Sequence, residues 1–160
     1  MAYSVSTPRI GFQPIAVTDT VQNHPLGTIV TAVDPTYGEG EFIYLKGVAS
    51  TVVGDTVIYD QYAATTTRTV AGSRGPAAVA MSANVASQYG WYQIAGTAIA
   101  KSATVVAGAS PYVTATAGTI DDAVVATDKI DGARFKTADG TPSAGFALLQ
   151  LDRPALNGNG

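Results

Sequence analysis

Short runs of β-branched and aromatic residues, separated about every ten positions by Gly, Pro, Asp or Asn, limit the folds open to this chain. Val, Ile, Thr and aromatic residues favour pleated strands, whereas the separating residues favour turns. The runs cover residues 28–33, 41–48, 55–59, 66–70, 77–81, 90–100, 112–116, 132–137 and 145–151. This rhythm predicts an all-β domain of about nine or ten short strands.

The run at residues 41–48 shows the alternation expected of a strand in a packed sheet. Phe42 and Tyr44 fall on one face and Ile43 falls on the other, so both faces are apolar. This pattern favours a β-sandwich or β-tulip-like domain whose outer face is also covered. Gly and β-branched residues break helical continuity, so only residues 81–87 and 121–127 could hold a turn or two of helix.

The chain divides into three expected parts. Residues 1–27 carry three prolines, which fix the backbone and remove hydrogen-bond donors, so they read as an extended N-terminal arm. Within this arm, residues 10–12 and 15–17 are candidates for short edge strands. We expect a single β-sandwich domain over residues 28–154, and the polar, glycine-ended residues 155–160 are expected to form a flexible tail.

The surface of this protein must be poor in charge. Charged residues make up 13% of the chain, about half the usual share, and the mean hydropathy is +0.17. Such a surface favours contact with other proteins, although a soluble domain rich in Ala and Thr would share this composition. The nine Lys and Arg residues are scattered, and the net charge is −3, so nucleic acid is not an expected partner.

Further classes are excluded by what the sequence lacks. Cysteine is absent, which removes disulfides and Cys-based metal sites. No apolar run approaches the ~20 residues of a membrane span, and residues 1–5 lack the basic and apolar regions of a signal peptide. We therefore expect a soluble protein made in the cytoplasm, with no membrane partner.

The side chains that could carry catalysis are few. His24 is the only histidine, so a Ser-His-Asp triad would have to use it, and a loop histidine is usually solvated or a cap. Glu39 and Glu41 form a tight acidic pair, but a solvated turn at residues 38–41 explains them. The glycine-rich segment 72–76 lacks the Gly-Lys-Ser/Thr ending of a phosphate loop. We expect no enzyme and no cofactor.

An acidic cluster raises the alternative of a calcium site. Asp121 and Asp122 are adjacent, and Asp128 and Asp131 follow them. Calcium prefers several loop oxygens, but this segment lacks an alternating ligand ladder with a closing Glu. Acidic residues in turns usually cap backbone amides or face water, so we predict no metal site.

Aromatic residues gather around one strand start. Tyr89, Trp91 and Tyr92 surround Gly90, and such rings are common both in cores and in interface hot spots. We expect Trp91 in the core and one of the tyrosines at a partner. If all three rings were exposed, they would instead form the platform of a carbohydrate-binding module.

Strands and glycine turns over residues 38–154 carry a family resemblance. The segments are 38–49 with 54–57, 75–84 with 88–98, and 131–136 with 145–154. In their order and texture they resemble the decoration (cement) proteins of tailed-phage capsids. The resemblance rests on the order of the strands and glycine turns, and it includes no catalytic motif.

This resemblance implies a β-sandwich or β-tulip domain that sits on the outside of the virion and bridges capsomers. The expected partners are the major capsid protein and further copies of the chain, with a homotrimer favoured over a homodimer. Alternatives are a head-fibre, tail or baseplate component. From the arm and the aromatic cluster we select the candidate contact residues Arg9, Ile10, Phe12, Ile15, Tyr89 and Tyr92.

Overall fold

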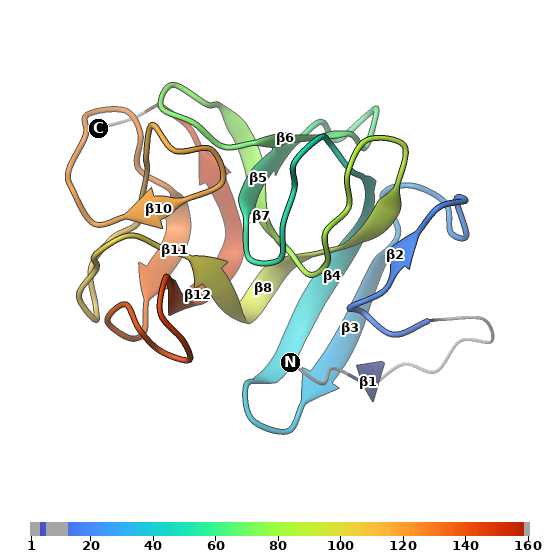
Figure 1. The fold of residues 1–160 in the computed structure, drawn as a ribbon, viewed down its shortest axis with the longest axis horizontal. Helices are drawn as coiled ribbons and strands as arrows, with labels where there is room; N and C mark the ends of the chain where they lie inside the picture. Colours follow the sequence, from blue (N-terminus) through green and yellow to red (C-terminus); the bar gives the residue numbers. More distant parts are fainter. Residues whose placement is uncertain (1–3, 6–12, 159–160) are drawn as a thin grey trace.

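The structure is a computed structural model, and it describes residues 4–5 and 13–158. Strands, turns and bends make up these residues, and no helix occurs among them, so the all-β prediction is confirmed (Figure 1). The strands are β1 (Ser4–Val5), β2 (Thr18–Asp19), β3 (Ile29–Asp34), β4 (Gly38–Lys46), β5 (Thr56–Tyr59), β6 (Thr66–Arg68), β7 (Gly75–Ala80), β8 (Tyr89–Lys101), β9 (Tyr112–Val113), β10 (Ile120–Asp121), β11 (Asp131–Phe135) and β12 (Phe146–Leu156).

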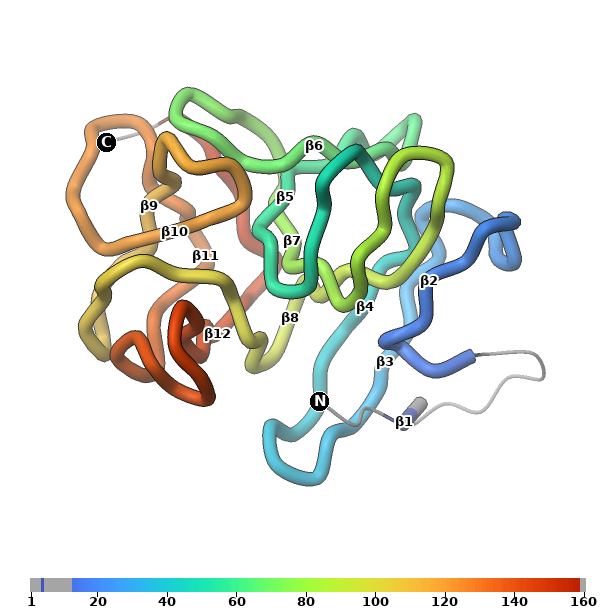
Figure 2. Tube along the Cα trace, viewed as in Figure 1, coloured from blue at the N-terminus to red at the C-terminus, as the bar shows by residue number. Residues whose placement is uncertain are grey.

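One curled antiparallel sheet holds most of these strands. Its order is β1-β3-β4-β8-β12-β7-β5-β6, with β11 added to β12 and β2 added to β8. The sheet curls because β7, β8 and β12 each pair with the other two, which folds β5, β6 and β7 back over β4 and β8. The result is sandwich-like, and β9 and β10 form a separate small sheet (Figures 1 and 2).

Strand β8 joins two lobes. Its 13 residues bend at Gly96, whose φ of 91° favours glycine. A Cβ at this position would lie 2.3 Å from the backbone oxygen of Glu39. The close approach of β4 to β8 at this point therefore requires glycine. We call residues 13–95 the N-lobe and residues 96–158 the C-lobe.

Three clusters of buried side chains stabilise the sheet. The arm core lies between the arm and β3, β4 and β8, and it comprises Ile15, Val30, Ala32, Phe42, Tyr44, Met81 and Trp91. The central core fills the curl of the sheet and comprises Ile43, Leu45, Val57, Ala64, Ala78, Ala80, Tyr92 and Ile94. The aliphatic core lies mainly in the C-lobe, with Ala77, Val79, Ala98, Ala100, Val105, Val113, Ile120, Ile130, Phe135, Ala147, Leu149, Leu151 and Leu156.

The two ends of the described chain pack against their own domain. Ile15 is buried in the arm core, and Leu26 packs against it, so residues 13–27 cover their own domain. The edge strand expected at residues 15–17 is a turn, and β2 follows it; the one expected at residues 10–12 lies outside the described residues. The flexible tail is wrong for Ala155 and Leu156, because both belong to β12 and Leu156 is buried in the aliphatic core.

Neither of the two segments that could hold a helical turn is helical. Residues 81–87 and 121–127 contain bends and hydrogen-bonded turns instead. Ser87 and Thr127 adopt φ values of 64° and 75°, which a right-handed helix does not allow. These conformations close the loops that lead into β8 and toward β11.

Candidate functional site

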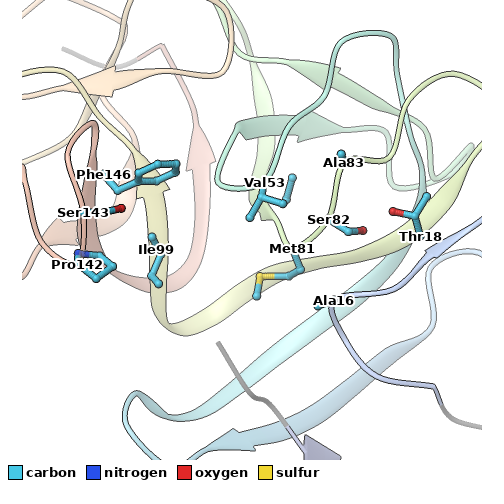
Figure 3. A pocket seen from close by; sticks show the side chains of 11 residues that line it. Ala16, Thr18, Val53, Met81, Ser82, Ala83, Ile99, Pro142, Ser143 and Phe146 are labelled. Carbon is cyan, nitrogen blue, oxygen red and sulfur yellow. The ribbon is translucent and has the colours of Figure 1, made fainter.

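An apolar groove of about 450 Å³ lies where the arm, the N-lobe and the C-lobe meet (Figure 3). Its floor includes the buried Ala80 and Met81, whereas Val53, Ala83 and Pro142 form part of its exposed rim. A volume of this size falls within the range of natural ligand and side-chain pockets. The remaining lining residues are Ala16, Thr18, Ser82, Ile99, Ser143 and Phe146.

Several elements build this groove, and each presents a small or apolar side chain to it. Ile99 points away from the aliphatic core, because Ala98 and Ala100 occupy the inward positions of β8. Phe146 begins β12 and packs over Gly54, where a Cβ would lie 2.7 Å from its ring. Ala16 and Thr18 bring the arm to the opposite wall (Figure 3).

None of the described residues that line the groove has an ionisable side chain. Burying a charged group there would be costly without a partner of opposite sign, so the groove suits an apolar or neutral polar side chain. The apolar surface also continues beyond it, since Val52 and Val53 are exposed on the loop before β5. Val106 and Val124 extend the exposed apolar surface on the C-lobe, and Val124 is 80% exposed.

The turn between β5 and β6 presents one aromatic ring to solvent. Tyr62 is fully exposed, at 101% of its reference area. Below it, a carboxylate oxygen of Asp60 accepts hydrogen bonds from the backbone amides of Tyr62 (2.8 Å) and Ala63 (2.6 Å). These two bonds lower the pKa of Asp60, and the Ala64 amide donates to the Asp60 carbonyl, so the turn is well defined.

His24 packs among the aromatic rings of β4 and β8. Its ring is half-buried and packs edge-on against Tyr44, with ring centroids 5.1 Å apart, and at a tilt against Trp91, at 5.4 Å. The Tyr44 hydroxyl donates to the Asp19 carboxylate at 2.5 Å. Burial raises the pKa of Tyr44, and the bond to Asp19 raises it further. The cluster therefore anchors the arm on β4 and β8.

A buried ion pair links the two lobes. Asp55 is fully buried, and its carboxylate lies 2.7 Å from the Arg68 guanidinium and 3.7 Å from the Lys101 ammonium at the end of β8. Arg68 also donates to the carbonyl of Ala117, and the amide of Thr56 donates to the carbonyl of Gly118. The charges are thus used to fix the C-lobe loop against β5 and β6.

The carboxylates of the acidic cluster bind backbone amides or cations. Asp121 accepts from the amide of Ala123, and Asp122 accepts from that of Val106. Asp128 accepts from Gly72, and Asp131 pairs with Lys129 at 3.5 Å. Within the part of the chain that the structure describes, no three His, Cys, Asp or Glu side chains gather closely enough to hold a metal ion.

The acidic pair and the glycine-rich segment are part of strands or lead into them. Glu39 and Glu41 lie in β4, which begins at Gly38, so the predicted turn over residues 38–41 is wrong. Glu41 pairs with Arg153 at 2.7 Å. The segment 72–76 runs into β7, as a structural turn does and a phosphate loop does not.

Three of the six predicted contact residues lie among the described residues, and all three pack against their own chain. Arg9, Ile10 and Phe12 lie outside the described residues. Ile15 and Tyr92 are buried in the arm core and the central core, so their side chains contact their own chain. Tyr89 is half-buried, and its ring stacks on that of Tyr44 at 6.4 Å.

The core position predicted for Trp91 is confirmed. Trp91 and Tyr92 are enclosed on opposite faces of β8, so they do not form an exposed platform for a carbohydrate. Sequence reasoning missed the groove and Tyr62. The signal for Tyr62 was present, because an aromatic residue in an Asp-initiated turn between two strand runs must point away from the sheet.

Among the described residues, the structure contains no helix with the length and apolar character that crossing a bilayer demands. No protein-family model, curated protein or solved structure matches this chain.

Proposed function

We propose that this chain is a non-enzymatic decoration protein that binds the outer surface of a tailed-phage capsid and stabilises contacts between its capsomers. The major capsid protein and further copies of the chain are its partners, in a homotrimer rather than a homodimer. One observation carries this proposal: an apolar groove opens between the lobes, none of its described lining residues is ionisable, and further valines are exposed on both lobes. Such a surface matches the interior of a protein interface.

The arrangement of the charged groups supports the same function. Asp55, Arg68 and Lys101 are used between the lobes, and Arg153 is used against Glu41, so these charges stabilise the fold. Apolar contacts spread over many copies add up, because each attached copy raises the effective concentration of the next contact. A rigid β-domain with little surface charge is suited to such repeated attachment.

Binding to phage heads tests the proposal. The purified chain is mixed with expanded heads that lack their decoration protein, and heads are separated from free protein by sedimentation. We expect saturable binding with a fixed number of copies per head, and a higher temperature of DNA release from the coated heads. Saturable binding to isolated tails or baseplates, with none to heads, would instead support the tail alternative.

Two surface variants test the role of the exposed apolar surface. Val53→Asp and Val124→Asp each place a charge on exposed apolar surface, on different lobes. A charge buried in an interface is costly, so at least one variant should bind heads more weakly while its unfolding midpoint stays unchanged. Wild-type binding by both variants would contradict the role assigned to this apolar surface.

A further inference from the structure

The exposed Tyr62 has the features of an interface anchor. Large aromatic residues that bury little of themselves in the free protein are rare on monomer surfaces and common at the centres of interfaces. The Asp60 carboxylate holds the turn from below through the amides of Tyr62 and Ala63. Because the backbone is already ordered, burial of the ring would cost little further conformational entropy.

The groove has the complementary features of a receptor for such an anchor. Its volume of about 450 Å³ accommodates an aromatic ring together with part of the backbone that carries it. Its lining is mostly apolar, and the hydroxyl-bearing Thr18 and Ser143 on its wall give a phenol hydroxyl polar neighbours. The ring and its two neighbours Gln61 and Ala63 are neutral, as the described lining of the groove is, whereas Asp60 carries the one charge of the turn.

Within one molecule this ring and this groove do not meet. Tyr62 is fully exposed, and no residue of the turn 60–64 lines the groove. Both features are therefore available to a second molecule at the same time. A second copy of the chain carries both a Tyr62 ring and a groove, so it offers a counterpart to each feature of the first copy.

We propose that Tyr62 of one copy inserts into the groove of a second copy. The interface is thus formed by two different surfaces, a turn and a groove, and repeating such a contact around an axis closes a ring. One aromatic side chain buries about 150–250 Å², well below what a stable interface needs, so the exposed Val52 and Val53 beside the groove contribute to the same contact. The inference deepens the proposed function, because it identifies the contact by which copies associate.

Two single variants and their mixture test the contact. Tyr62→Ala removes the ring, and Ala83→Arg places a long charged side chain on the exposed rim of the groove (Figure 3). Light scattering across a concentration series gives the mass of each sample. We expect the wild type to associate, and each variant to associate at least about 30-fold more weakly, as for an interface hot spot.

The mixture separates this contact from general stickiness. The Tyr62→Ala copy keeps its groove, and the Ala83→Arg copy keeps its ring, so an equimolar mixture restores one intact contact. We expect a species of two copies in the mixture that neither variant forms alone. Val21→Ala, which truncates an exposed side chain that neither lines the groove nor belongs to the Tyr62 turn, is the matched control and should associate as the wild type does.

The proposal is overturned if the wild type is a monomer at all concentrations, if Tyr62→Ala associates as strongly as the wild type, or if the mixture forms no species of two copies. Circular dichroism and the unfolding midpoint of each variant show whether the fold is retained; both changes are at exposed positions. Binding to heads is measured separately on the same samples. A chain that associates through Tyr62 but never binds heads would retain this inference and refute the proposed function.

Discussion

The two halves of β8 are built differently, although one strand forms both. In the N-lobe, residues 90–94 are all buried, because Trp91 faces the arm core and Tyr92 faces the central core. In the C-lobe, Ala98 and Ala100 face the aliphatic core, while Ile99 faces the groove. The first half is thus the middle of three layers, and the second half is one side of a two-layer packing.

This difference assigns separate tasks to the two halves. Covering both faces of residues 90–94 needs large aromatic rings and recruits the arm, which contributes Ile15. Leaving one face of residues 97–101 partly open creates the wall on which the groove forms. Stability is therefore concentrated where the sheet is covered twice, and the apolar surface proposed for binding lies where it is covered once.

The largest expected effect comes from removing the ring at the centre of the three-layer half. Trp91→Ala should lower the free energy of unfolding by about 4 kcal/mol, because it leaves a large cavity among fully buried neighbours. Leu149→Ala in the aliphatic core should cost about 3 kcal/mol. Urea denaturation measures both. If Trp91→Ala costs no more than the exposed Val124→Ala, the first half is not packed on both faces.

Gly96, where the halves meet, offers the second test. Gly96→Ala forces a side chain onto a residue with a φ of 91° and drives its Cβ toward the Glu39 carbonyl, so we expect a loss of about 3 kcal/mol. Gly140→Ala is the matched control, since its φ is 89° and its Cβ would meet open space. It should cost about 1 kcal/mol. Equal losses in the two variants would show that the close approach of β4 is unimportant.

The charge cluster around Asp55, which reaches the C-lobe through Lys101, gives a smaller effect. Arg68→Leu leaves the buried Asp55 carboxylate with Lys101 as its remaining cation and with the Val52 amide, and we expect a loss of about 2 kcal/mol, reduced from that of a fully buried pair because Arg68 is partly solvated. Arg74→Leu breaks a pair of 3.5 Å whose cation is more exposed, and should cost less than about 1 kcal/mol. Denaturation measures both losses. A larger loss for Arg74→Leu than for Arg68→Leu would contradict the role of Asp55 in joining the lobes.

The smallest effect at neutral pH concerns the phenol of Tyr44. Tyr44→Phe removes its hydrogen bond to Asp19, which Gln13 still contacts, so we expect a loss of about 1 kcal/mol. Burial raises the pKa values of Tyr44, Tyr59 and Tyr92 above that of an unfolded tyrosine, about 10. The unfolded chain then ionises first, so stability is complete below about pH 10 and falls as the pH rises further.

Unfolding free energies measured at rising pH check this dependence. Above about pH 10 the wild type should lose stability more steeply than Tyr44→Phe, because the variant no longer keeps that phenol protonated on folding. Tyr62→Phe changes an exposed phenol and should follow the wild type. Parallel curves for the wild type and Tyr44→Phe would mean that the three-layer half does not bury this ring.

Alternation and turn residues in the sequence predicted most strands of the fold. The runs at 41–48 and 90–100 match β4 and β8 closely, since β-branched and aromatic residues are dense there. The two-residue strands β1, β2 and β10 were missed, because so short a pairing is decided by the neighbouring strand. The end of β12 was missed because residues 155–160 are mostly polar and glycine-ended, whereas Leu156 packs into a core built from distant residues.

The site was less predictable than the fold. Alternation assigns Tyr92 to the face opposite Trp91, but it does not reveal that β5, β6 and β7 fold back to cover that face. The groove depends on Ala16, Val53 and Phe146 meeting from three remote segments, and no local pattern records such a meeting. For this reason, the sequence prediction selected Tyr89 and Tyr92 as contact residues, although both rings pack inside the fold.

The continuity of β8 through both lobes has a mechanical consequence. Its residues pair with β4 up to Ala95 and with β12 from Ala95 onward, in antiparallel ladders whose hydrogen bonds lie across the strand direction. A force along β8 therefore acts on these bonds in shear, and many must break together before the lobes separate. Tension between the lobes passes along the covalent backbone of β8, which is held in the sheet. A linker between separate domains would instead extend under the same force.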